Sequence, residues 1–133
     1  MSQPQALPTD AELQLLRHLW SHGPSTVRTL HEAVYGAATS YTTTLRLVQN
    51  LHAKRLVLRD ADERQHVYAA AVNENVTMAA ITRRVMDRAF GGSAAELAMR
   101  ALDARPASRE ELRELKKLIA RMEKAERSDE GSL

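Results

Sequence analysis

The sequence predicts a mainly α-helical fold in which one pair of strands interrupts the helices. Apolar residues recur at helical spacing over residues 13–56 and again over residues 73–122, which indicates amphipathic helices on both sides of the interruption. Between them, residues 57–59 and 65–70 are short extended runs around the polar segment 60–64, a pattern typical of a β-hairpin. We therefore expect helices, then a two-stranded hairpin, then helices again.

This order divides the chain into two expected domains and a tail. Residues 1–72 form the first domain, residues 73–127 form a helical domain, and residues 128–133 are a polar tail. Of the 133 residues, 44% are hydrophobic but only 4% are aromatic. The packed core must therefore consist mainly of Leu, Val, Ala and Met side chains.

The first predicted helix follows a loose lead-in, residues 1–8. Thr9-Asp10-Ala11-Glu12 has the pattern of a capping box, in which the Thr9 hydroxyl and the Glu12 carboxylate accept hydrogen bonds from free backbone N–H groups. Gly23-Pro24 ends this helix, because Gly adopts the left-handed cap and Pro cannot continue a helix. The apolar positions expected to face the core are Leu13, Leu16, Leu19 and Trp20.

A second helix is expected to begin after Ser25 and Thr26, whose hydroxyls suit an N-cap, and to end at Gly36. Its inward side chains are predicted to be Val27, Leu30, Ala33 and Val34. A short loop, residues 37–39, then leads to a third helix.

The third helix, residues 40–56, has two faces of different character. One is an apolar stripe about 100° wide, formed by Thr44, Leu47, Val48 and Leu51. The other carries short polar side chains around one guanidinium, and consists of Thr42, Thr43, Arg46, Gln49, Asn50 and Ala53. A solvated face usually pairs acids with bases, whereas no Asp or Glu occurs between Glu32 and Asp60. Such a face suits the major groove of DNA.

Three short helices followed by a hairpin predict a winged helix-turn-helix DNA-binding domain, in which the third helix reads base edges. The hairpin tip carries Arg59 and Arg64 beside three acids, so only the two arginines are candidate phosphate contacts. Asn50 is a further candidate because it shares the helix face of Arg46.

Helical spacing resumes at Asn73 or Asn75, and Gly91-Gly92 interrupts it. Two further capping boxes are expected, over residues 93–96 and 108–111. Polar residues from Glu126 onward are expected to be frayed.

In the last helix, four apolar residues at spacings of three, four and three form a seam shorter than two heptads. Such a seam is not stable alone and needs a partner. We therefore predict a C-terminal helical dimerisation region, whose contact residues are Met78, Ile81, Val85, Leu97, Leu102, Leu112, Leu115, Ile119 and Met122.

Several classes of protein are excluded by features that the sequence lacks. Without cysteine there is no disulfide, thiolate metal site or cysteine nucleophile. Catalytic serine and nucleotide-binding motifs are missing, so we predict no enzyme and no cofactor. His18 and His22 are spaced i,i+4 without a third ligand nearby in sequence, so no metal site is predicted. With neither a long apolar run nor a signal peptide, we expect a cytoplasmic protein without membrane contact.

Four segments carry a resemblance to a known family: Leu-Arg-His-Leu-Trp at 16–20, Thr-Val-Arg-Thr-Leu-His-Glu-Ala-Val at 26–34, Ser-Tyr-Thr-Thr-Thr-Leu at 40–45 and Arg-Gln-His-Val-Tyr at 64–68. In these segments the sequence resembles the penicillinase-repressor family of bacterial winged-helix regulators, the BlaI and MecI group with its copper-responsive relatives. The resemblance runs from about Thr9 to Met122 and is strongest in the first 72 residues.

The resemblance implies a homodimer in which each winged helix binds half of a palindromic operator in double-stranded DNA, while the C-terminal helices interlock. It also implies repression of resistance or metal-handling genes. The family positions that meet DNA correspond to Ser40, Thr42, Thr43 and Arg46. Tyr41 stands where a bulky residue or a proline is common in the family.

The sequence departs from the family in three places. Arg55 stands where Gly is frequent, and a left-handed cap there would cost about 1 to 2 kcal/mol. Members released by an upstream membrane sensor protease carry an Asn-Phe pair, but the matching residues here are Arg100-Ala101, so the sequence does not predict that partner. The cysteine-rich tail of the copper-responsive branch is missing.

We therefore predict a dimeric transcriptional repressor that binds a palindromic operator through the third helix. Two alternatives stay open on the sequence. A winged helix can serve as a protein-interaction module that does not read DNA. A DNA-binding chain of this kind can also hold a small-molecule sensor between its two halves.

Overall fold

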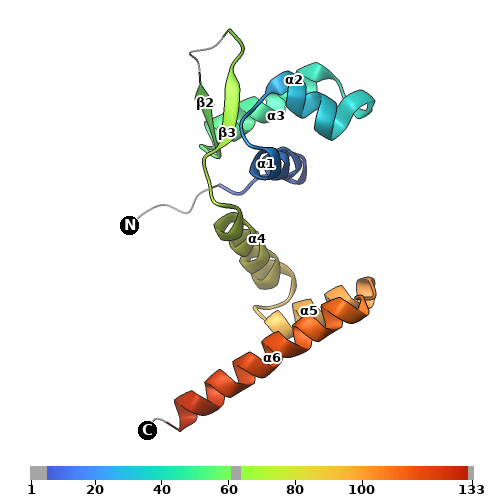
Figure 1. Ribbon diagram of the computed structural model, residues 1–133, viewed down its shortest axis with the longest axis vertical. Coiled ribbons are helices and arrows are strands. Elements are labelled where there is room, and N and C mark those ends of the chain that lie inside the picture. Colours follow the sequence, from blue (N-terminus) through green and yellow to red (C-terminus); the bar gives the residue numbers. More distant parts are fainter. Residues whose placement is uncertain (1–5, 61–63, 132–133) are drawn as a thin grey trace. The chain divides into compact units, whose positions relative to one another are not determined.

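The structure is a computed structural model that describes residues 6–60 and 64–131, over which six α-helices and three short β-strands form (Figure 1). This confirms the mainly α-helical fold. The start of the expected lead-in, residues 61–63 of the hairpin tip and the last two residues of the tail lie outside the described residues. The chain forms two compact units, Met1–Val85 and Met86–Leu133.

The winged-helix elements follow the predicted order. They are α1 (Asp10–His22), β1 (Ser25–Thr26), α2 (Val27–Leu30), a π-helical turn (His31–Tyr35), a 3-10 turn (Gly36–Ala38), α3 (Tyr41–Ala53), β2 (Val57–Asp60) and β3 (Val67–Ala70). Three further helices complete the chain, α4 (Glu74–Ala89), α5 (Ala94–Ala104) and α6 (Arg109–Glu130).

The sheet has three strands rather than the predicted two. The strand order is β1-β3-β2, and both pairings are antiparallel. The additional strand, Ser25–Thr26, pairs Ser25 with Tyr68, while Thr26 also caps α2 by accepting a hydrogen bond from the Thr29 N–H group. Two residues are too few to show strand alternation, so only the capping pattern of this segment could be recognised from the sequence. The predicted second run also begins later, at Val67.

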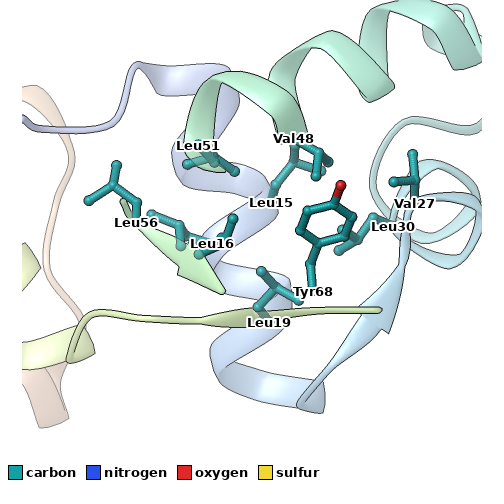
Figure 2. Packing of buried hydrophobic residues seen from close by; sticks show 10 residues of the cluster. Leu15, Leu16, Leu19, Val27, Leu30, Val48, Leu51, Leu56 and Tyr68 are labelled. Atoms are coloured by element: carbon teal, nitrogen blue, oxygen red, sulfur yellow. The ribbon is translucent and has the colours of Figure 1, made fainter. Parts of the chain in front are cut away.

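One apolar core joins α1, α2, α3 and the sheet (Figure 2). Figure 2 shows Val48 and Leu51 pointing from α3 toward α1, with the Tyr68 ring of β3 beside them. Because buried apolar area contributes about 25 cal/mol per Å², this shared core fixes one side of α3. Its buried members are Leu15, Leu16, Leu19, Val27, Leu30, Val48, Leu51, Leu56, Val57 and Tyr68.

Two positions differ from the predicted pattern. Leu15 is fully buried and Leu13 only partly buried, because the buried face of α1 is centred on Glu12, Leu15, Leu16 and Leu19, and Leu13 lies at its edge. Ala33 is exposed. It lies in the π-helical turn that follows Leu30, where more residues per turn rotate the later side chains away from the helical phase assumed for residues 27–36.

The capping signals are confirmed at both ends of the chain and only in part between them. Complete capping boxes form at Thr9 with Glu12 and at Ser108 with Glu111. At Ser93 only the hydroxyl half forms, because the Ser93 N–H group donates to the Phe90 carbonyl at 2.9 Å instead.

Arg55, which stands where the family frequently has Gly, adopts the left-handed conformation. Its φ is 64°, and it is the one non-glycine with positive φ among the described residues. The Leu56 N–H group donates to the Leu51 carbonyl at 2.9 Å, which is the bond expected when a helix ends in a left-handed residue. A side chain here costs about 1 to 2 kcal/mol relative to glycine.

The boundaries of α4 and α6 refine the sequence prediction. Asn73 rather than Asn75 caps α4, since its Oδ1 accepts a hydrogen bond from the Val76 N–H group at 3.1 Å. The last helix does not fray at Glu126 but continues to Glu130. Its final turns contain good helix formers, and the Ser128 hydroxyl donates to the Lys124 carbonyl at 3.1 Å.

The residues predicted for dimerisation leave apolar surface uncovered in the single chain. Met78, Val85, Leu102, Leu112, Ile119 and Met122 are exposed, and Ile81, Leu97 and Leu115 are partly buried. On α6, the exposed fractions of Ile119 and Met122 are 55% and 62%. Exposed apolar side chains gathered along a helix are a feature of interaction sites.

Candidate nucleic-acid interface

The outward face of α3 is polar and uncovered. Thr42, Thr43, Arg46 and Asn50 are all exposed, while Thr44, Val48 and Leu51 on the other side are buried. The local cause is the helical period. Residues three and four apart share a face of the helix, so the apolar positions of α3 face the core and the polar positions face solvent.

Two of the candidate hydroxyls take part in the start of the helix. Ser40 is the N-cap of α3, and its Oγ accepts a hydrogen bond from the Thr43 N–H group at 3.2 Å. The Ser40 and Thr43 hydroxyl oxygens also lie 2.9 Å apart. These bonds hold the first turn of α3 in one conformation while both side chains stay exposed.

A histidine that the sequence did not single out supports the buried side of α3. The His31 Nδ1 lies 2.8 Å from the Thr44 hydroxyl, which is fully buried. A buried hydroxyl without a partner would destabilise the fold, so His31 makes this polar position tolerable inside an apolar stripe. The only sequence signal was a threonine among leucines and valines.

Tyr41, the first residue of α3, is held from two sides. The Arg28 guanidinium lies 5.4 Å from the centre of its ring, a cation–π contact. The His31 ring meets it edge to face, with centres 5.8 Å apart. Even so, Tyr41 is 41% exposed, so α3 presents a fixed aromatic side chain at its start. Arg28 was quoted in a family segment but had no predicted role.

The wing arginines Arg59 and Arg64 are both exposed. Arg59 lies in β2, opposite Tyr68 of β3, and Arg64 precedes β3. A cleft of about 290 Å³ opens between the start of α2, the start of α3 and the segment before β3. Arg64 lines this cleft, and Arg59 does not.

An ion pair in the first unit fixes the far end of α3. Glu12 of α1 is 1% exposed, and its carboxylate accepts hydrogen bonds from the Thr9 N–H group at 2.9 Å and from the Lys54 ammonium. Lys54 is the C-cap residue of α3. Burial raises the pKa of Glu12, but the bonds from Lys54 and Thr9 and the Lys54 charge outweigh it and lower the pKa below its ordinary 4.5.

Replacing Glu12 with glutamine is expected to lower the free energy of unfolding by about 2 kcal/mol near pH 7, because Lys54 loses its buried partner. Since the folded pKa lies below 4.5, the carboxylate stabilises the fold above that value, and the effect is lost as pH falls through the folded pKa. Urea unfolding of both proteins should therefore show a difference in the free energy of unfolding near pH 7 that becomes smaller as the pH is lowered below 4.5.

The matched control is Glu111→Gln, at the same capping-box position of α6 but without a lysine hydrogen-bonded to its carboxylate. This variant is expected to lower the free energy of unfolding less than Glu12→Gln does. A difference for Glu12→Gln that keeps its size as the pH is lowered below 4.5 would contradict the assigned role of the charge.

The two histidines of α1 make no metal centre with other residues in the described part of the chain. Their rings stack at 4.2 Å, and the His22 Nδ1 lies 3.3 Å from the His18 carbonyl. Burial and the neighbouring His22 lower the pKa of His18. Among residues 6–60 and 64–131, no group of three or more His, Asp or Glu side chains is placed to hold a metal ion.

No helix in the described ranges combines the length and apolar character that crossing a bilayer requires.

Comparison with known proteins gives relatives over the N-terminal part. The curated Transcriptional regulator BlaI of Mycobacterium tuberculosis, in strains CDC 1551 / Oshkosh and ATCC 25618 / H37Rv, is 44% identical over 62 residues. The match covers 45% of this chain and 45% of the relative, so the chain spans less than half of the length of these curated relatives.

Solved structures with similar coordinates belong to other regulators. MepR, described as a transcription regulator of the Staphylococcus aureus multidrug efflux pump MepA, aligns with a TM-score of 0.49 and 18% identity over 89% of this chain and 79% of that one. A MarR family protein from Bacillus stearothermophilus aligns with a TM-score of 0.49 and 21% identity, covering 88% and 74%.

The sequence model of the penicillinase repressor family matches residues 8–121, which include the three-helix core, the wing and most of the C-terminal helices. Its members and the curated relatives are transcriptional regulators rather than enzymes. By sequence and by its winged-helix fold, this chain belongs to the penicillinase repressor family of transcriptional regulators.

Proposed function

We propose that the protein is a dimeric transcriptional repressor that binds a palindromic operator, with α3 of each subunit in the major groove. In this proposal Arg46 contacts a guanine edge or a nearby phosphate. Ser40, Thr42 and Thr43 set the register, Tyr41 and Asn50 contribute at the groove, and Arg59 and Arg64 bind phosphates. Direct base reading needs donors and acceptors at base edges, which these side chains supply.

One observation carries the proposal: the acid-free polar face of α3 is exposed while its opposite face is locked into the core. Arg46 and Asn50 are uncovered, and Val48 and Leu51 are at most 1% exposed. A recognition helix needs both properties, because its backbone must stay rigid while its outer side chains exchange water for base edges.

The dimer is part of the proposal and rests on the exposed apolar surface of the C-terminal helices. The seam residues Leu112, Ile119 and Met122 are 42%, 55% and 62% exposed in the single chain. A second copy of the chain supplies an equal apolar seam that can cover these residues. A two-fold symmetric dimer of this kind matches the symmetry of a palindromic operator. On this basis residues 1–72 bind DNA, and residues 73–127 form the dimer.

Salt dependence tests the proposal against the alternative of a protein-interaction module. Operator fragments are selected from genomic DNA, and binding is measured by fluorescence anisotropy as salt rises from about 50 to about 200 mM. We expect the affinity to fall by roughly 10³-fold or more, because about six phosphate contacts release counterions. A shallow or zero salt slope, or no selection of specific fragments, would exclude the repressor proposal.

A further inference from the structure

Among the residues that the structure describes, the cleft beside α3 is lined by two arginines and by no carboxylate. It measures about 290 Å³, and its charged and polar lining includes Arg28 of α2, with Arg64, Gln65 and His66 of the segment before β3. Tyr41 forms the wall on the α3 side. The cleft therefore presents two guanidiniums from separate elements to a ligand.

Arg28 is the less obvious of the two cations, because it pairs with Glu32 one turn later. The Nη1 to Oε1 distance is 3.9 Å, and the two side chains are 67% and 68% exposed. An exposed pair at this distance contributes little to stability. The Arg28 guanidinium is therefore available to an incoming anion at small cost.

The position of Arg28 is nevertheless well defined. Its guanidinium stacks over the Tyr41 ring at 5.4 Å, and the His31 ring contacts the same tyrosine. Tyr41 is the first residue of α3, so this stack places a permanent positive charge beside the first turn of the helix proposed to enter the groove.

We propose that this cleft holds the sugar-phosphate backbone of one DNA strand, with Arg28 and Arg64 each paired to a phosphate. The inference rests on the proposed function, because a helix in the major groove has a backbone strand alongside its first turn. Guanidinium binds phosphate oxygens through paired N–H donors, and Gln65 in the same lining supplies a neutral donor. This contact is independent of base sequence.

A duplex strand fits this arrangement better than a small anion does. Two guanidiniums carried by separate elements suit a ligand that offers repeated charges along its length. A single small anion could pair with both only by drawing exposed side chains from α2 and from the strand segment together, which costs side-chain entropy. A free phosphate-bearing molecule is therefore an outcome of the test, not the proposal.

The test measures the salt slope of operator binding for Arg28→Gln, Arg64→Gln and the double variant. Because the proposed dimer carries each arginine twice, each single change is expected to reduce the slope of log K against log salt by about 1.8, and the double variant by about 3.6. The ratio of operator to random-duplex affinity should stay as in the natural chain, since phosphates carry no base information. Arg17→Gln, an exposed arginine of α1 outside this cleft, is the matched control and should leave the slope unchanged.

Further variants separate phosphate binding from support of Tyr41. Arg28→Lys keeps the charge and should keep the slope, and Tyr41→Leu should keep it as well. Glu32→Gln removes the competing acid and should tighten binding to any duplex by roughly threefold. Inorganic phosphate at about 10 mM should not compete, beyond its ionic strength, with the natural chain.

Three results would overturn the inference: an unchanged slope for Arg28→Gln, an Arg28→Lys defect as large as that of Arg28→Gln, or specific competition by inorganic phosphate. The failure is distinguishable from failure of the proposed function. If the natural chain shows a steep salt slope and Arg28→Gln and Arg64→Gln do not reduce it, the phosphate contacts in the cleft are excluded and the repressor proposal stands.

Discussion

Replacing Arg46 with alanine is expected to weaken operator binding by about 1 to 3 kcal/mol per half-site contact. Because a symmetric dimer carries Arg46 twice, the combined loss reaches roughly 2 to 6 kcal/mol, which is enough to abolish a gel shift at protein concentrations that saturate the natural chain. The reason is that Arg46 is the one cation on the exposed, acid-free face of α3 within the helix bounds Tyr41–Ala53.

The measurement is a gel shift with the selected operator, next to a random duplex of the same length. The operator-to-random ratio should fall, in contrast to the Arg28 and Arg64 variants, which lower both affinities together. Arg17→Ala, at an exposed position of α1 outside the proposed interface, is the control for the loss of one arginine. Unchanged operator affinity in the Arg46 variant, with an intact dimer and unchanged circular dichroism, would refute the groove assignment.

Introducing glutamate at Ile119 is expected to dissociate the dimer. Ile119 lies in the middle of the α6 seam and is 55% exposed in the single chain. Covering this side chain in a dimer would stabilise the dimer by about 2 kcal/mol per copy. The variant loses this stabilisation in both subunits and places two carboxylates in an apolar interface. We expect a dimer dissociation constant raised by roughly a thousandfold or more.

Analytical ultracentrifugation measures this change directly, and operator binding should weaken with it, because a monomer loses the gain from binding two linked half-sites. Ala120→Glu is the matched control, since it adds the same charge one residue away from the seam on an exposed side of α6. A dimer that survives Ile119→Glu but not Ala120→Glu would place the interface on another face of the helix.

The sequence was sufficient for the elements whose physical cause is local. Capping boxes at Thr9 and Ser108 depend on residues three apart, and they formed as predicted. The two faces of α3 depend on a period of 3.6 residues, and the separation of buried Thr44 and Val48 from exposed Arg46 follows from it. Even the left-handed Arg55 could be anticipated from one departure from the family pattern.

The tertiary structure decided the features that join residues far apart in sequence. Strand β1 exists because Ser25 pairs with Tyr68, and Glu12 is buried because Lys54 reaches it from the end of α3. A two-residue segment does not predict its strand partner, and an acid in a capping box does not predict a distant lysine. The same holds for the cleft, which Arg28 and Arg64 both line only because α2 and the wing fold beside α3. Local periodicity therefore determined which face of α3 is free, and long-range packing decided which charges lie next to it, because contact between distant segments leaves no periodic trace in the chain.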